Sequence, residues 1–476
     1  MELQLEQQQI SCLIPSALRT VEERVSADFV VPDSMPDAAE LLLTEGALCL
    51  WRLDLSDGSA ELEGELSAQI CCADEHGAPM SFPAHVPVQL RLRAEAIETG
   101  QKPFLRCHMK SLNGQLLNSR KVRVQGILSC SLQTYSTSEY MITTGVASKD
   151  QGLFVRKTAL PVAYVSSVEE QVYPVEDTLS LRLGVPADGR WISHCSVPIL
   201  DSCDCLEQRV ILKGRVRTSL LYEDADSRKL VDEAVETPFS FLMDVNGAVS
   251  KCAVSLHFTS EEVRCRNDDP AVDTEFHLLA QVICFAQQEL ECVTDAYSNR
   301  NKLDLKWNEL RLPVLIRQEK EQIFMEETLP CDLNGKTISA VRSFCNGDMI
   351  TVTALLADED RKLTSASAVL NPKQNADNII WAEQPEVMIG KNSVTVRVPV
   401  LSQRETADES TMRVLISAEL KDEKTNRQSG VTLLRRDDEK DLWELAKSYG
   451  SSVEAIRAAN PDSDRQGKWI VVPHVL

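Results

Sequence analysis

Apolar and polar residues alternate with a period of two through most of this 476-residue chain, and this alternation limits the fold more than any other feature. Successive side chains of an extended strand point to opposite faces, so the pattern is typical of half-buried β-strands. Turn pairs such as Asp57-Gly58 and Asn246-Gly247 separate the runs at intervals suited to hairpins. We therefore expect antiparallel sheets, with Asp37–Leu43 as the clearest helical exception in the body of the chain. The clearest alternating runs are 88–93, 121–127, 254–258 and 393–400.

Short motifs recur about 150 residues apart, which indicates an internal repeat. Glu22–Val25, Glu169–Val172 and Lys320–Ile323 share one pattern, and Gly64 and Gly214 lie in register within the first two copies. The third copy lacks this glycine and is shorter. We predict tandem antiparallel β domains, built as sandwiches or open barrels, over residues 1–152 (copy 1), 153–302 (copy 2) and 303–427 (copy 3, degenerate).

The last segment, 428–476, changes from the strand period to a helical one. Gly450 closes the first short amphipathic pattern, and Ser451 with Glu454 has the spacing of a capping box that begins a second helix. The chain is therefore predicted to be mainly β, with tandem antiparallel β-sandwich-like repeats followed by a small C-terminal βααβ domain. Its expected elements are a strand at 431–434, helices at 441–450 and 451–460, and a strand at 469–472.

This terminal segment resembles a LysM domain in Asp441–Trp443, Ala446–Gly450, Ala458–Pro461 and Gly467–Pro473. The resemblance implies a shallow groove between the turn before the first helix and the loop after the second. The usual Gly-Asp-Thr turn is replaced here by Glu439-Lys440-Asp441, which argues against sugar binding. The partner-binding residues that the resemblance implies for this groove are Lys440, Asp441, Lys447, Asn460, Asp462 and Trp469.

The repeats resemble SPOCS domains, the β-rich units of spore-envelope proteins in endospore-forming bacteria. The resemblance lies in Asp28–Asp37, Asn118–Val122, Leu212–Val216 and Thr237–Phe239. SPOCS repeats followed by one LysM domain is the order found in the SipL-like family of coat morphogenesis proteins. The resemblance implies a non-enzymatic adaptor or scaffold in spore coat and envelope assembly, which docks a SpoIVA-type coat ATPase through its LysM domain.

The same resemblance implies a place in the mother-cell cytoplasm at the forespore surface. The start, Met1–Gln9, lacks the basic and apolar regions of a signal peptide, and no apolar run is long enough for a membrane span. A formal charge of −22 without a basic stripe argues against nucleic-acid partners. The alternative function is a wall-associated protein that binds peptidoglycan, a polymer containing N-acetylglucosamine.

No catalytic constellation is visible among the seven histidines, so we expect no enzyme activity and no cofactor. His194 and Cys195 are adjacent on a predicted strand and point to opposite faces, which prevents proton sharing. Scattered acidic pairs such as Glu326-Glu327 leave a hydrolase as a third possibility. Asp33–Asp37 has a metal-like appearance, but Pro32 and Pro36 favour a rigid turn.

The cysteines are expected to be reduced core thiols, because their number, fifteen, is odd and they lie in strand-like runs. The only close pairs are Cys71-Cys72 and Cys203-Asp-Cys205, and neither has the spacing of a structural zinc site. We therefore expect no metal. Of the two terminal tryptophans, Trp443 is expected to fill the core, while Trp469 suits core and contact surface equally.

Overall fold

The fold is mainly β, as the alternating pattern predicts, and this prediction is confirmed. The computed structural model describes residues 1–147, 152–266, 270–329, 331, 333–346, 349–370, 379–382, 385–390, 393–424, 430–435, 441–461 and 469–474. These residues form strands β1 to β21, helices α1 and α2, and one short 3-10 turn, η1 (Ala187–Gly189). No helix within the described ranges is long and apolar enough to cross a membrane.

Each copy begins and ends with a long strand, and shorter strands lie between. Copy 1 contains β1 (Gln4–Val30), β2 (Ala38–Ser56), β3 (Ser59–Asp74), β4 (Pro79–Arg93), β5 (Lys102–Asn118) and β6 (Lys121–Ala147). Copy 2 contains β7 (Leu153–Ser180), β8 (Ser193–Leu206), β9 (Arg209–Glu223), β10 (Leu230–Asp244), β11 (Lys251–Cys265) and β12 (Ala271–Ser298). Copy 3 contains β13 (Asn301–Leu329), β14 (Lys336–Asn346), β15 (Met349–Asp358), β16 (Leu363–Leu370), β17 (Ile379–Ala382), β18 (Glu386–Ile389) and β19 (Val394–Lys424).

The same connectivity recurs in all three copies. The first and last strands pair along their lengths, as β1 with β6, β7 with β12 and β13 with β19, all antiparallel. The next three strands form a meander, and the fifth strand pairs with the last; in copy 3 the short β17 and β18 take that place. Thus each copy closes on itself through the pairing of its two ends.

Copies 1 and 2 also share a sheet, so these two copies are not independent domains. A nine-stranded sheet has the order β4-β3-β2-β11-β12-β7-β1-β6-β5, and it joins copies 1 and 2 through the pairs Phe258–Cys49 and Leu13–Val165. The boundary expected at 152/153 falls between β6 and β7, and the one at 302/303 falls two residues into β13. The boundary expected at 427/428 lies outside the described residues.

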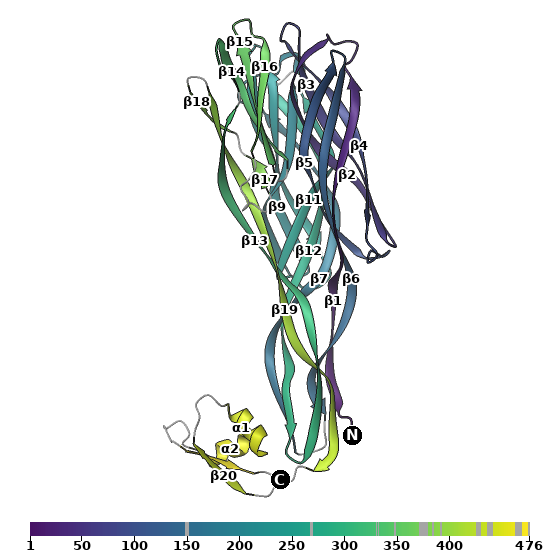
Figure 1. Ribbon diagram of the computed structural model, residues 1–476, viewed down its shortest axis with the longest axis vertical. Coiled ribbons are helices and arrows are strands. Elements are labelled where there is room, and N and C mark those ends of the chain that lie inside the picture. Colours follow the sequence, from purple (N-terminus) through teal and green to yellow (C-terminus); the bar gives the residue numbers. More distant parts are fainter. Residues whose placement is uncertain are drawn as a thin grey trace.

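The three copies lie around the long axis of the molecule, as a wide head on a narrow stalk (Figure 1). The stalk consists of the ends of the six long strands that lie away from the meanders, and its core takes residues from every one of them. The head contains the meanders and has one apolar core per copy. The stalk core residues are Ile10, Cys12, Ile142, Val162, Leu290, Cys292, Leu310, Leu312, Met412 and Val414.

A buried ionic network joins all three copies inside the head. The Arg342 guanidinium from β14 donates to the Glu45 carboxylate of β2 at 2.8 Å and to the Asp232 carboxylate of β10 at 2.6 Å. The Ser193 hydroxyl of β8 donates to Glu45 at 2.8 Å. Only 3% of the Arg342 side chain and 5% of the Glu45 side chain are exposed.

The paired glycines of the repeat lie beside equivalent bulges in the neighbouring strands. Gly64 on β3 lies opposite Leu50, and Gly214 on β9 lies opposite Leu200; each neighbour is followed by a register shift. A Cβ atom on Gly64 would contact the carbonyl oxygen of Cys49, and one on Gly214 would contact that of Ile199. Both glycines are therefore required by close backbone approach rather than by an unusual φ angle.

Two expectations from the sequence are corrected by the fold. The segment 37–43, expected to be helical, is extended and forms the start of strand β2 from Ala38 on; its Leu42 and Leu43 are buried in a core shared by all three meanders. Tertiary burial therefore outweighs the local helical preference of this run. The expectation of reduced thiols is wrong for two pairs, Cys107–Cys130 and Cys203–Cys252, which form disulfides; ten other described cysteines form no disulfide.

Candidate functional site

The terminal module, residues 430–435, 441–461 and 469–474, has the element order strand, helix, helix, strand. Its elements are β20 (Val431–Arg435), α1 (Leu442–Tyr449), α2 (Val453–Ala459) and β21 (Trp469–Pro473), with β20 and β21 antiparallel. Asp441 caps α1 by accepting from the Trp443 amide, and Gly450 closes it in the left-handed conformation with φ of 65°.

The cap of α2 differs by one residue from the sequence expectation. Ser452, not Ser451, is the N-cap, because its hydroxyl accepts a hydrogen bond from the Ala455 amide at 3.0 Å. Ser451 is buried, and its amide donates to the Ala446 carbonyl in the closing turn of α1. Because the loop between the helices is so short, the residue expected to start α2 is used to end α1.

Helix α1 docks the module on the end of the stalk. The Asp295 carboxylate of β12 accepts hydrogen bonds from the Trp443 indole at 2.8 Å and from the Lys447 ammonium at 2.7 Å. Directly opposite Asp295 on β7, Arg156 forms an ion pair with Asp441 at 2.9 Å. The acidic residue before α1 therefore contacts a basic stalk residue, and the lysine near the end of α1 contacts an acidic one.

Aromatic packing reinforces this docking. Tyr297 of β12 stacks on Phe154 of β7 with ring centres 5.1 Å apart, and it meets the Trp443 ring edge-on at 4.9 Å. The Tyr297 hydroxyl donates to the Ser451 carbonyl at 2.8 Å. Tyr297 is also part of the apolar core that contains Ala446 and Ile456. The core of the module is thus completed by the body of the chain.

The residues predicted to line a partner groove have different roles in the structure. Asp441 and Lys447 form ion pairs with Arg156 and Asp295 of the stalk, and Lys447 also lines a cavity of about 570 Å³ between α1 and the stalk. The Asn460 side chain joins α2 to β21, donating to the Ile456 and Val471 carbonyls and accepting from the Val471 amide. Trp469 is exposed. Lys440 and Asp462 lie outside the described residues.

One face of the terminal module exposes apolar side chains. Val431 and Leu433 on β20 are 68% and 58% exposed, and Trp469 on β21 is 60% exposed. Leu434 and Ile470 point the other way, into the core of the module. We call Val431, Leu433 and Trp469 the outer apolar face. Sequence analysis singled out Trp469 but missed the two β20 residues, although their alternation with Thr432 and Leu434 was the available signal.

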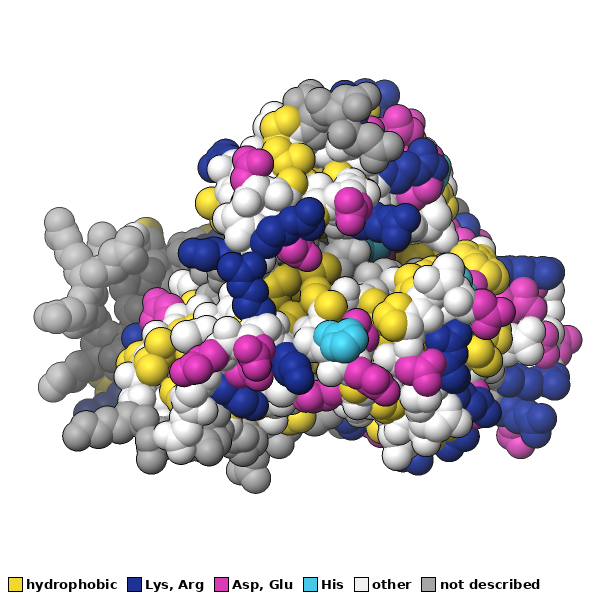
Figure 2. Space-filling view, turned by 90° about the horizontal axis from the view of Figure 1, so that it is seen from above, with side chains coloured by type: hydrophobic (Ala, Val, Ile, Leu, Met, Phe, Trp, Pro, Cys, Tyr) yellow, Lys and Arg dark blue, Asp and Glu magenta, His cyan; other side chains and the backbone are white. Residues whose placement is uncertain are grey.

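The opposite end of the molecule is hollowed where the three meanders meet. Figure 2 looks onto this end and shows hydrophobic side chains at the floor, with charged side chains of both signs around them. The cavity has a volume of about 670 Å³. Its rim includes His76 from copy 1, Arg228 and Lys229 from copy 2, and Asp358 and Arg361 from copy 3.

One histidine lies close to a buried acid inside the head. His194 Nε2 on β8 is 3.9 Å from Glu261 Oε1 on β11. Burial lowers the pKa of His194 to about 4 and raises the pKa of Glu261 to about 7. Both groups are therefore neutral over part of the acidic range, and sequence spacing gave no sign that they meet.

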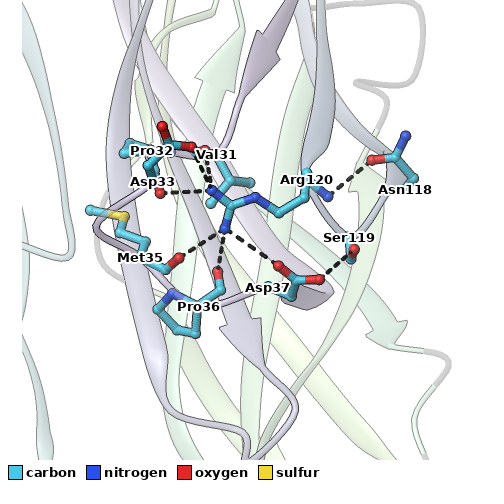
Figure 3. A network of polar contacts seen from close by, with 9 residues as sticks. All are labelled: Val31, Pro32, Asp33, Met35, Pro36, Asp37, Asn118, Ser119 and Arg120. Carbon is cyan, nitrogen blue, oxygen red and sulfur yellow. Dashed lines mark hydrogen bonds and ion pairs between the residues drawn. The ribbon is translucent and has the colours of Figure 1, made fainter.

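Two of the stretches that resemble SPOCS domains come together in copy 1. Arg120, in the turn between β5 and β6, donates to the Val31 carbonyl at 2.8 Å and to the Met35 carbonyl at 2.8 Å (Figure 3). Its guanidinium also lies 3.4 Å from the carboxylates of Asp33 and Asp37. Asp33–Asp37 is thus a turn held by one arginine, in agreement with the rigid turn that its prolines favour.

Comparison with known proteins found no match for this chain. No protein-family model matches the chain, no curated protein matches it, and no solved structure matches its fold.

Proposed function

We propose that this protein is a non-enzymatic adaptor in spore coat and envelope assembly, which docks a coat morphogenetic ATPase of the SpoIVA type through its terminal module. The proposal takes the partner and the location, the mother-cell cytoplasm at the forespore surface, from the family resemblance. The outer apolar face is the observation that carries it, because exposed apolar patches mark sites of protein contact.

The form of the body suits a spacer between a surface and a partner. The three β copies share cores, and copies 1 and 2 share a sheet, which supports a stiff unit; the module is fixed at the far end of the stalk from the head. The docked helix α1 orients the outer apolar face away from the stalk contacts of Trp443 and Lys447. An adaptor of this kind would hold its partner at a defined distance from whatever the head contacts.

The decisive experiment measures ATPase binding to the full chain and to Trp469→Ala. Aromatic anchors at the centre of an interface typically contribute about 2 kcal/mol or more, so we expect the dissociation constant to rise at least about 30-fold. Trp51→Ala is the matched control, because Trp51 is a similarly exposed tryptophan, 58% exposed, on β2 of the head. Unchanged binding in both Trp469→Ala and Leu433→Ser would refute the proposal.

The same variants separate the adaptor from the alternative of peptidoglycan binding. An exposed indole also stacks on sugar rings, and Trp469 directly follows the connection after α2 where the LysM resemblance implies a sugar groove. Sedimentation with purified peptidoglycan would support this alternative if the wild-type chain were captured, Trp469→Ala were not, and the ATPase bound neither.

A further inference from the structure

Three cysteine sulfurs from distant parts of copy 2 meet in one cluster. Cys203 and Cys205 lie near the end of β8, and Cys252 lies at the start of β11. Their Sγ atoms are all within 4.8 Å of one another, and all three residues are half-buried. Cys203 and Cys252 are joined by a disulfide, and Cys205 is free. We call these residues the copy 2 thiol cluster.

The strand geometry explains how the cluster forms. Cys203 and Cys205 are two residues apart on one strand, so both side chains point to the same face while Asp204 points outward. Cys252, on strand β11, brings its sulfur to the same place from a strand that lies against β8. Cys252 is paired in register with Cys284 of β12, which is buried and adds a fourth thiol beside the cluster. Sequence spacing could not reveal the cluster, since β11 begins 45 residues after the end of β8, at Lys251 against Leu206.

Copy 1 provides an internal reference for these positions. Cys203 and Cys205 pair with Leu212 and Val210 of β9, two and four residues before Gly214. The equivalent positions before Gly64 pair with Leu53 and Leu55 of β2, which pack against the core of copy 1. Packing at this place therefore requires only apolar side chains. Cys203 and Cys252 also pack against the core of copy 2, whereas Cys205 is not part of that core.

We propose that, in the reduced protein, the copy 2 thiol cluster binds a thiophilic metal ion of the Zn²⁺ class. Thiolates at about 2.3 Å from a tetrahedral Zn²⁺ lie about 3.8 Å apart, a spacing open to the Cys203 and Cys252 sulfurs only after their disulfide is reduced. Cys284 or a water molecule would complete the tetrahedron. The metal ion displaces the thiol protons, so each bound thiolate releases one proton on binding.

The disulfide and the metal site are alternative uses of the same sulfurs. A dithiol reductant transfers two electrons and two protons to Cys203–Cys252, which breaks the S–S bond and converts the reductant to a cyclic disulfide. The cytoplasmic location proposed above keeps thiols reduced, which favours the metal-bound form there.

The test uses the full chain, reduced with a dithiol and then supplied with Zn²⁺ or Co²⁺. We expect one ion per chain, and thiolate-to-Co²⁺ charge-transfer absorption with the Co²⁺ form. Cys205→Ser should weaken binding by more than about 100-fold, since even residues that only support metal ligands contribute about 10- to 100-fold. Cys265→Ser is the control, because Cys265 is a free, half-buried thiol of the same copy outside the cluster. It should bind like the wild-type chain.

The double variant Cys203→Leu/Cys205→Leu copies the arrangement of copy 1 and should fold without binding the ion. Circular dichroism and thermal unfolding would verify the fold, and Cys205→Ser carries the test if the double variant does not fold. Absence of bound metal in the fully reduced wild-type chain would overturn the proposal. Undiminished binding by the double variant would do the same.

Discussion

Arg342 connects all three copies through side-chain contacts that no local sequence pattern predicts. It lies 297 residues from Glu45 in sequence and yet forms a buried ion pair with it. A guanidinium can serve two carboxylates at once because its donors are arranged in a planar fork. The network therefore fixes how β14 of copy 3 sits against β2 of copy 1 and β10 of copy 2.

Replacement of Arg342 by methionine should be strongly destabilising. The change leaves Glu45 buried without its cation, and loss of one partner of a buried pair typically lowers the free energy of unfolding by about 3–5 kcal/mol. Chemical denaturation of both proteins measures the difference. The triple variant Glu45→Leu/Asp232→Leu/Arg342→Met should recover much of the loss. Equal stability of wild type and the single variant would contradict this account.

Glu261 predicts a dependence of stability on pH. Its pKa is raised by burial to about 7 from 4.5, so between these values the folded state holds a proton that the unfolded chain has lost. Stability therefore falls as pH rises through this window. His194 acts oppositely, because its lowered pKa of about 4 makes stability rise with pH up to about 6.5.

Glu261→Gln removes the pH dependence of stability that comes from Glu261 and keeps the one that comes from His194. The variant should gain stability relative to the wild-type chain as pH rises from about 5 to about 7.5, by up to about 3 kcal/mol. Urea denaturation at several pH values measures this gain. His194→Gln is the companion control, which should change the slope with the opposite sign. A difference between Glu261→Gln and wild type that does not vary with pH would refute the assignment.

At the scale of elements, the period of two predicted strand type and approximate position across the body, and the helical spacing of the terminal segment predicted both helices. Bulges, strand partners and shared sheets were not predictable, because they depend on residues far apart in sequence. The segment 37–43 shows the limit most clearly: its composition favours a helix, but burial of Leu42 and Leu43 between copies decides for a strand. The docking contact of the terminal module was not predictable for the same reason, because nothing in the sequence around Lys447 indicates that it pairs with Asp295.

The docking of α1 should be measurable as a coupling between Asp295 and Lys447. Both groups are partly exposed, so the ion pair alone is modest, but Asp295 also accepts from the Trp443 indole. A double-mutant cycle with Asp295→Ala and Lys447→Ala should give a coupling of about 1 kcal/mol. Protease sensitivity of the terminal module, or its hydrogen exchange, provides the readout.

Lys421→Ala with Asp304→Ala is a suitable reference cycle for that measurement. These residues form an exposed ion pair on β19 and β13, at 3.1 Å, without an additional aromatic donor. The reference pair should leave the protection of the terminal module unchanged. Strictly additive effects of Asp295→Ala and Lys447→Ala on module protection would show that the contact does not hold the helix.

At the scale of the whole molecule, the body should unfold as one unit. The stalk core contains residues from all six long strands, and the head shares a further core among the three meanders. Loss of one copy therefore exposes apolar surface of the other two. We expect a single calorimetric transition for residues 1–424, with equal calorimetric and van't Hoff enthalpies. Three resolved transitions would indicate independent domains.

The docking of the terminal module on copy 2 has a further consequence for symmetry. A complex of three identical chains must present the same residues at every equivalent place, but tandem copies within one chain are released from that constraint. Phe154 and Tyr297 form a register pair at the base of copy 2, and the equivalent pair in copy 1 is Gln4 and Ala147. Likewise Arg156 and Asp295 correspond to Glu6 and Gly145. The differences between copies 1 and 2 thus give the terminal module a docking place on copy 2 that copy 1 does not repeat.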